Sequence, residues 1–390
     1  MNSVYLISDN IITSLGFSTE ENMLAILRGE IGIKTHSDPH LSPFPLPLSQ
    51  VDTHGLNDRF NQLLKDSCRD QIADSYTRLE KIFILSIHQA LSEGSINPRD
   101  KRMVLILSTT KGNIDLLEEH FKARFPHKRI YLWELARTIQ DFFGLANTPV
   151  VVSNACISGV LAITMAARWI QMGRWDHVIV SGGDIISEFV ISGFQAFQSL
   201  SSEPCKPYDI HRDGLSLGEA AGTVILSGQK GLLNRSSVRV SGASVSNDAN
   251  HISGPSRTGK ELSLAMDKAI KESGLDATMI DHISAHGTAT LFNDEMESKA
   301  MEISHLTKVP LNSYKGYWGH TLGAAGLIES VASIWSLNHN LLIKSAGFEK
   351  PGVPVPIHII EKNTPANLNT CLKTASGFGG CNAAVVFQKC

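Results

Sequence analysis

The sequence lacks the features that mark a secreted, membrane-spanning or nucleic-acid-binding protein. Its 390 residues include only six cysteines, too few for a disulfide scaffold. No window approaches 18 uninterrupted apolar residues, and the N-terminal segment has neither the basic start nor the apolar run of a signal peptide. Lysine and arginine (35) nearly balance aspartate and glutamate (38), which argues against a basic nucleic-acid binder. We therefore expect a cytoplasmic protein that binds neither membrane nor nucleic acid.

Short apolar runs that alternate with helical patterns organise the chain. Apolar residues make up 42% of it, enough for two domains or one large α/β unit. Alternating strands and helices favour a parallel sheet covered on both faces. The predicted buried strands lie within residues 103–113, 149–159, 177–185 and 279–288, and the predicted helices within 159–173 and 326–340.

Two stretches have the composition of surface loops. Residues 36–62 contain four prolines and few periodic apolar positions, and residues 200–214 have a similar loop character. In addition, the segments 153–170 and 312–335 both turn through small residues into a helix rich in alanine and glycine. This likeness is consistent with a duplicated βα architecture, although it does not establish one.

Cys156 lies in SNACISG, where a strand ends near Ser153 and a helix begins near Ile157 or Ser158. A cysteine at that place faces the unpaired N–H groups and the positive pole of the helix. This field lowers the pKa of a thiol and favours a nucleophilic thiolate. The alternative is a buried, unreactive cysteine, which is the commoner fate of this residue type.

His286 closes the apolar strand 279–288, at the end of the strand where α/β folds place their ligands. The alternative is a histidine bonded to nearby backbone. His282 lies four residues earlier, which corresponds to about 13 Å along a strand. Two histidines so far apart cannot bind one metal ion.

Lys315 and His320 lie on a glycine-rich turn that precedes the helix 326–340, and Glu329 follows nine residues after this histidine. Lysine, histidine and glutamate near one helix start can form an acid–base and charge-pair set. The alternative is an ordinary turn with solvated charges. The turn also resembles a phosphate cradle, but neither GxxxxGK[ST] nor GxGxxG is present.

The segment SGFGGCNAAVVF (376–387) places three glycines around Phe378, just before a final apolar strand. Backbone N–H groups in such a turn can point at an oxyanion. Cys381 is a second candidate thiol here, but no helical pattern follows to activate it.

Taken together, these motifs resemble those of the β-ketoacyl-acyl-carrier-protein synthases, the condensing enzymes with a Cys–His–His active site. The resemblance runs over nearly the whole chain. The spacing agrees as well, with 130 residues from Cys156 to His286 and 34 more to His320. The matching stretches are ITSLGFSTEENMLAILRGEIGI, NACISG, PYDIHRDGLSLGEAAG, AHGTATLFND, KGYWGHTLGAAGLIE and GFGGCNA.

The resemblance implies an α/β thiolase fold, in which two similar βαβαβαβαβ halves stack in five α/β/α/β/α layers. Residues 1–230 would carry the cysteine and residues 231–390 the two histidines. It also implies a homodimer. The family's partner is an acyl carrier protein, whose phosphopantetheine arm brings the substrate, and no metal or bound cofactor is implied.

The resemblance also implies a role for each matching residue. Cys156 would accept the acyl group, His286 and His320 would donate hydrogen bonds to the enolate formed by loss of CO2 from a malonyl unit, and the product would be two carbons longer. Lys315 would orient these histidines. The implied supporting residues are Glu329, Asp294 and Phe378, the last as gate and oxyanion-hole backbone. The implied substrate-binding residues are Thr288, Thr290, Phe194 and Lys111.

Two positions depart from the family pattern. Lys111 stands where relatives often carry a small or apolar pocket residue, so a long saturated acyl chain is a less suitable substrate. Cys381 replaces the usual threonine or histidine and leaves a thiolase as one alternative, because thiolases use a second cysteine. The other alternative is a chain-length-setting partner subunit of a synthase heterodimer, although such subunits usually lack the cysteine that this chain keeps.

Overall fold

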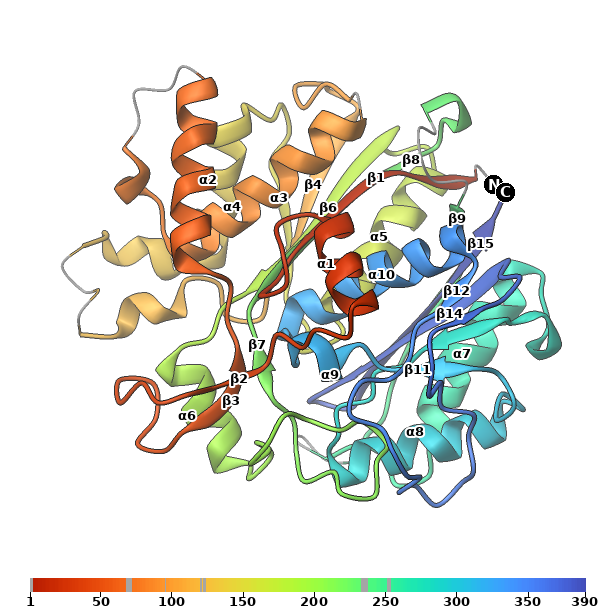
Figure 1. Ribbon diagram of the computed structural model, residues 1–390. Helices are drawn as coiled ribbons and strands as arrows, with labels where there is room; N and C mark the ends of the chain where they lie inside the picture. Colours follow the sequence, from red (N-terminus) through yellow and green to blue (C-terminus); the bar gives the residue numbers. More distant parts are fainter. Residues whose placement is uncertain are drawn as a thin grey trace.

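The computed structural model describes residues 3–67, 72–94, 96–119, 121, 124–232, 238–250 and 254–390. Its ten main strands form two five-stranded halves (Figure 1). The first half has the order β5-β4-β6-β8-β1 and the second has the order β11-β10-β14-β15-β9. The first set is β1 (Val4–Ile12), β4 (Met103–Ser108), β5 (Val150–Val152), β6 (His177–Asp184) and β8 (Ala220–Ser227). The second set is β9 (Val238–Asn247), β10 (His282–Ser284), β11 (Leu311–Asn312), β14 (Thr370–Gly377) and β15 (Cys381–Lys389).

The two halves repeat one topology. In the first half, β4 runs parallel to β5 and β6, and β8 is antiparallel to β6 and β1. In the second half, β10 runs parallel to β11 and β14, and β15 is antiparallel to β14 and β9. Strand pairing joins the halves at the start of β1, where Val4 and Tyr5 pair with Val240 and Arg239 of β9. This repetition confirms the predicted duplication and the thiolase fold.

Helices complete the five layers. The helix α3 (Arg78–Gly94) covers the outer face of the first half, and α7 (Lys260–Ser273) covers that of the second. Between the halves lie α5 (Ser158–Gln171) and α10 (Ala325–His339), which contact each other. These two confirm the predicted helices, and every residue of α10 from Ala325 to Leu337 is buried.

The central helices α5 and α10 pack so closely that small residues are needed where they meet. A Cβ on Gly159 of α5 would lie 2.6 Å from the backbone nitrogen of Leu327 of α10. A Cβ on Gly326 would lie 2.6 Å from a methyl of Val160. The two backbones therefore approach closely at the N-terminal ends of both helices, where the site described below is found.

The prediction of a surface loop over residues 36–62 is wrong for its second part, because α2 (Thr53–Asp66) begins there. The Asp52 side chain caps this helix by accepting hydrogen bonds from the N–H groups of His54 and Gly55. Leu56, Phe60, Leu63 and Leu64 are buried against α3 and its sheet. The four prolines lie before the helix, in a segment with the short strands β2 (Lys34–His36) and β3 (Leu46–Ser49).

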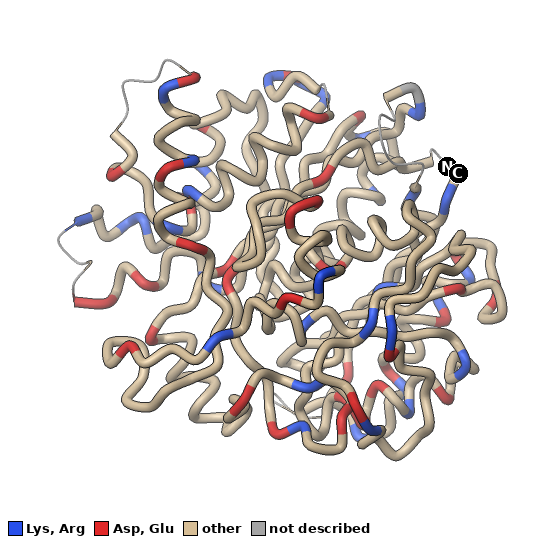
Figure 2. Tube along the Cα trace, viewed as in Figure 1, with Lys and Arg blue, Asp and Glu red and all other residues tan. Residues whose placement is uncertain are grey.

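The remaining elements lie at the ends and edges of the two sheets. The predicted loop 200–214 is confirmed, since it contains only turns and isolated bridges. Lysine and arginine are interspersed with aspartate and glutamate over the whole trace that is drawn (Figure 2). In the described part of the chain, no helix is long and apolar enough to cross a membrane. The helices and strands not yet given are α1 (Thr19–Leu27), α4 (Leu132–Phe143), α6 (Glu188–Ala196), α8 (Leu291–Ile303), α9 (Lys315–Trp318), β7 (Leu217–Gly218), β12 (Leu341–Leu342) and β13 (Thr364–Pro365).

Candidate active site

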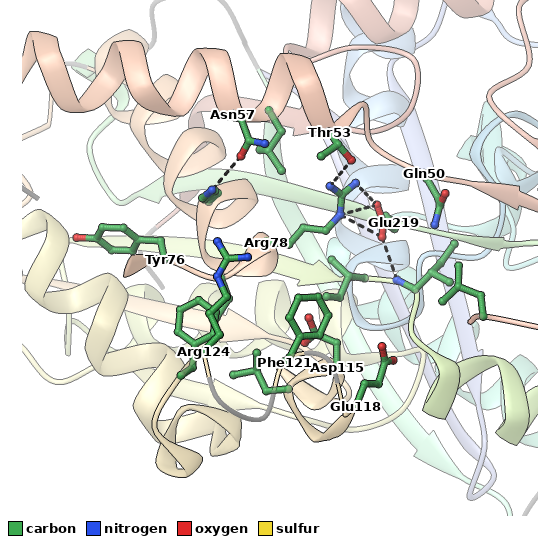
Figure 3. Close-up of a pocket in the computed structure, with 18 of the residues that line it drawn as sticks. Gln50, Thr53, Asn57, Tyr76, Arg78, Asp115, Glu118, Phe121, Arg124 and Glu219 are labelled. Carbon is green, nitrogen blue, oxygen red and sulfur yellow. Dashed lines mark hydrogen bonds and ion pairs between the residues drawn. The ribbon is translucent and has the colours of Figure 1, made fainter. Parts of the chain in front are cut away.

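A cavity of about 650 Å³ lies beside α2 and α3 and contains none of the predicted site residues (Figure 3). Some of the polar side chains that line it bond to one another. For example, the Arg78 guanidinium forms an ion pair of 2.6 Å with Glu219 and donates to the hydroxyl of Thr53. Asp115 is buried there, and burial raises its pKa to about 7. The residues that line this cavity include neither a cysteine nor a serine, so size alone does not identify the site of chemistry.

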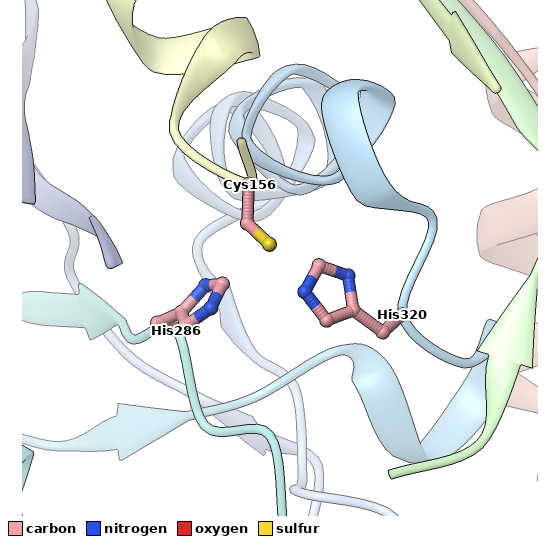
Figure 4. Close-up of side chains that lie close together, drawn as sticks. All are labelled: Cys156, His286 and His320. Carbon is pink, nitrogen blue, oxygen red and sulfur yellow. The ribbon is translucent and has the colours of Figure 1, made fainter. Parts of the chain in front are cut away.

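The predicted residues meet in a second cavity, of about 390 Å³. Cys156, His286 and His320 all line it, although they come from three distant parts of the chain (Figure 4). The cysteine sulfur and one nitrogen of each imidazole ring lie within 4.8 Å of one another. The two imidazole rings are 5.3 Å apart and nearly perpendicular, with an interplanar angle of 84°.

The backbone around Cys156 is a strained turn between β5 and α5. Ala155 adopts a left-handed conformation with φ of 43°, which is unfavourable for a residue with a Cβ. The Ser158 hydroxyl donates to the Ala155 carbonyl and accepts from the N–H of Asn154, which fixes the turn. Cys156 thus stands two residues before the first residue of α5, close to the predicted position.

The predicted lowering of the Cys156 pKa is wrong for the free protein. Burial raises this pKa to about 12, and the positive charge of Lys315 opposes the increase only in part. The sequence showed the local field of the helix but not the removal of the thiol from water, which disfavours the charged form. The thiol is therefore protonated at neutral pH until a substrate enters.

Both histidines are neutral and share one tautomer. Burial, reinforced by the charge of Lys315, lowers the pKa of each ring well below its ordinary value. The Nδ1 atom of His320 accepts a hydrogen bond from the N–H of Leu322 at 3.1 Å. The Nδ1 atom of His286 faces the Lys315 ammonium at 3.4 Å. The ring proton of each histidine accordingly belongs on Nε2, which leaves two neutral N–H donors.

Lys315 is fully buried and pairs with the predicted carboxylate. Its Nζ lies 2.6 Å from Glu329 Oε1 and donates to the carbonyl of His286 at 2.6 Å. Lys373 of β14, which the sequence analysis missed, forms an ion pair of 2.6 Å with the other carboxylate oxygen of Glu329. Glu329 therefore stands between two lysines.

Asp294 and a second missed residue, Glu297, hold the turn that carries His286. The Asp294 carboxylate accepts from the N–H of Thr288 at 3.0 Å, and burial raises its pKa to about 7. Glu297, one turn further along α8, accepts from the N–H groups of His286 (2.8 Å) and Gly287 (2.7 Å). Glu297 follows Asp294 by three residues, which puts both side chains on one face of a helix. This spacing could have identified Glu297 from the sequence.

Aromatic and hydroxyl side chains form the rest of the wall. The Phe378 ring lies 5.7 Å from that of Phe194 and 5.1 Å from that of Phe197, and all three line the cavity. Thr288 and Thr290 line it too and share a hydrogen bond of 2.8 Å. Phe197, which is 53% exposed, was not predicted.

Lys111 is not among the residues that line this cavity, but its positive charge also opposes the rise of the Cys156 pKa, and its place in the acyl pocket stays a prediction. Its backbone N–H is bonded to the buried carboxylate of Asp184, which also accepts from the amides of Thr110 and Gly323. This carboxylate ties the loop after β4 to the turn that follows His320. The position of Lys111 thus depends on a long-range contact that the sequence did not reveal.

Cys381 is not part of this cavity wall either. Its sulfur faces the carbonyl of Phe378 at 3.3 Å, and burial raises its pKa to about 11. A thiolase needs a second cysteine that acts as a base on the substrate. The geometry of Cys381 does not favour this alternative.

By donor type, Cys156, His286 and His320 are the described residues best suited to hold a metal ion such as zinc. Two lysines lie directly behind them, however. Lys315 contacts His286, and Lys315 and Lys373 share a single carboxylate partner in Glu329. This surplus of positive charge favours an anion in the cavity over a cation.

Comparison with known families and proteins shows the family of the chain. Residues 5–230 match the family model of the β-ketoacyl synthase N-terminal domain, and residues 238–349 match that of the C-terminal domain. The chain is 27% identical to 3-oxoacyl-[acyl-carrier-protein] synthase 2 of Vibrio cholerae, over 97% of both chains. It is 30% identical to a putative mitochondrial 3-oxoacyl-[acyl-carrier-protein] synthase of Schizosaccharomyces pombe, over 64% of each.

Solved structures show the same fold. A β-ketoacyl synthase from Burkholderia phymatum aligns over 100% of both chains with a TM-score of 0.87 and 23% identity. A ketosynthase from Xenorhabdus doucetiae, solved in complex with its chain length factor, aligns over 100% of this chain and 98% of its own, with a TM-score of 0.85 and 23% identity. Because the two family models together cover most of its length, the chain belongs to the β-ketoacyl synthase family of condensing acyltransferases.

Proposed function

We propose that this enzyme joins an acyl group, held as a thioester on Cys156, to the two-carbon unit of a malonyl-carrier protein. The observation that carries this proposal is the meeting of one thiol and two neutral imidazole rings in one cavity, where the sulfur and one nitrogen of each ring lie within 4.8 Å of one another. No bound cofactor takes part, and the phosphopantetheine arm of the carrier protein serves as substrate carrier.

In the first step the sulfur of Cys156 attacks the thioester carbonyl of the incoming acyl group. The backbone N–H groups of Cys156 and Phe378 would hold the oxyanion. This role is supported by Gly377, where a Cβ would lie only 3.0 Å from the Cys156 nitrogen, so that the two segments come close. The proton of the Cys156 thiol leaves with the departing pantetheine sulfur, which keeps the step neutral.

In the second step the malonyl unit loses CO2, and the resulting enolate oxygen accepts hydrogen bonds from Nε2 of His286 and His320. The enolate carbon then attacks the acyl-cysteine, which forms the new carbon–carbon bond and releases the Cys156 thiolate to take up a proton. Lys315, held by Glu329, would orient His286 through its Nδ1 and carbonyl.

Mass spectrometry tests this function directly. The purified enzyme is mixed with an acyl-carrier protein and then with malonyl-carrier protein. We expect an acyl mass on the peptide that contains Cys156, followed by a β-ketoacyl product two carbons longer on the carrier. An acyl mass on another cysteine, or a product without chain extension, would contradict the proposal.

The carrier protein is proposed to dock at the mouth of the catalytic cavity. A neighbouring cavity of about 610 Å³ shares Gly254, Pro255 and Phe292 with it and is also lined by Arg257 and Lys299. Phe292 is 63% exposed, and the Lys299 ammonium donates to the Arg257 carbonyl at 3.0 Å. Two cations around an exposed aromatic ring suit the phosphate of the pantetheine arm and an acidic carrier surface.

Charge reversal at Arg257 should therefore weaken carrier binding selectively. For Arg257→Glu we expect the KM for malonyl-carrier protein to rise about tenfold with little change in kcat, because a rim charge acts on encounter. Steady-state kinetics measure this. Lys308→Glu, in the turn after α8 and outside the lining of both cavities, is the matched control, and malonyl-N-acetylcysteamine, which lacks the phosphate, should react equally with all variants. An equal loss with both substrates would refute this docking site.

The proposed quaternary structure is a dimer with a second copy or with a homologous partner subunit. The short strand β5 forms an open edge of the sheet. The first turn of the adjoining α4 carries the stacked rings of Tyr131, its N-cap, and Trp133, which are 45% and 56% exposed. Light scattering distinguishes a homodimer from a chain that needs a different partner. The proposed compartment is the cytoplasm, which is supported by five free cysteines in the described part of the chain.

A further inference from the structure

Lys373 is a second fully buried lysine behind the two histidines, and the reaction scheme above does not use it. It lies in the middle of β14 with 0% exposure. Its Nζ forms the 2.6 Å ion pair with Glu329 Oε2 and donates to the carbonyls of Ser284 and Ala285 at 3.2 Å each. These carbonyls belong to the two residues directly before His286.

Lys315 and Lys373 both donate hydrogen bonds to backbone carbonyls at the end of β10 and directly after it. Lys315 binds the carbonyl of His286, while Lys373 binds the two carbonyls before it. Both share the single carboxylate of Glu329, so this ion-paired group of three carries a net charge of +1, and the next carboxylate that acts on Lys373 is that of Glu297. Burying an extra charge is costly, and such a group is more often retained for function than for stability.

We infer that Lys373 is a positioning residue for decarboxylation, which fixes the end of β10 behind His286 and supplies the surplus positive charge that favours an enolate in the cavity. This inference rests on the proposed function. Burial is the main cause that lowers the pKa of His286 and of His320, and Lys373 contributes to both shifts. Its removal should let the rings become protonated at higher pH.

The other charged groups around the rings come from five elements and stay in place when Lys373 is replaced. A change in ring protonation can therefore be assigned to the missing lysine. These groups are Lys315 of α9, Glu329 of α10, Asp294 and Glu297 of α8, Asp184 of β6 and Lys111 of the loop after β4.

The test is the pH dependence of CO2 release from a malonyl thioester. For Lys373→Met we expect the rate to fall about tenfold and the acid limb of the profile to move up by about one pH unit. Lys373→Arg keeps the charge and should keep the acid limb. Cys371→Ala, two residues earlier on the same face of β14, is a matched core control that should lower only the melting temperature.

A charge-restoring double variant tests the same inference by a second route. Lys373→Met combined with Glu329→Gln returns the group to one net positive charge, so the acid limb should move back toward that of the wild type. An acid limb unchanged in Lys373→Met, or shifted equally in Lys373→Arg, would overturn the inference. A wild-type enzyme that released no CO2 would instead contradict the proposed function itself.

Discussion

Cys156→Ala should abolish acyl transfer and condensation, with a loss on the order of 10⁴-fold or more, because the covalent intermediate can no longer form. Release of CO2 from malonyl-carrier protein should remain measurable. The two imidazole donors lie on different elements from the cysteine, and each is held by its own Nδ1 contact. One variant therefore separates the two halves of the reaction.

The measurement combines radiolabelled acyl transfer with detection of CO2 from the same preparation. Cys381→Ala is the matched control, since this nearby thiol points at the Phe378 carbonyl and does not line the cavity. It should retain condensation within a few fold. If Cys381→Ala is as inactive as Cys156→Ala, the assignment of a single nucleophile is wrong and the thiolase alternative regains support.

The three central residues were found from the sequence because each stands at a junction between elements, two of them where a strand ends and one on the turn before a helix. Cys156 follows β5, His286 follows β10, and His320 lies on the glycine-rich turn before α10. Such junctions can be recognised locally, and the resemblance brought them together. The structure then supplied their separation and the tautomer of each ring, which depend on contacts outside the motifs.

What the sequence missed depends on contacts between distant segments. Lys373 stands in the strand sequence TCLKTASG, where nothing local indicates that its ammonium faces Glu329 on another element. Asp184 likewise ends an apolar strand, and its hydrogen bonds reach two separate turns. The pKa of Cys156 was mispredicted for the same reason, since the removal of a thiol from water is a property of the whole fold.

His320→Ala should reduce malonyl decarboxylation by about 10²–10³-fold, the usual cost of losing one donor to a developing oxyanion. The ring is only 1% exposed and its Nδ1 is held by the Leu322 N–H. Its Nε2 donor is therefore fixed before the substrate arrives. Water cannot replace a fixed donor fully, because a small cavity must reorganise around it. Acylation of Cys156 should persist, since the oxyanion of that step is held by backbone N–H groups.

Rates of CO2 release and of acyl-cysteine formation, measured on one preparation, decide whether His320 has this role. His282→Ala is a matched control, because this second buried histidine bonds to Asn312 and Cys371 and has no place in the cavity wall. It should change stability more than either rate. If His320→Ala released CO2 normally but failed to become acylated, His320 would serve as the base for Cys156. The enolate would then depend on His286 and on the positive charge behind it.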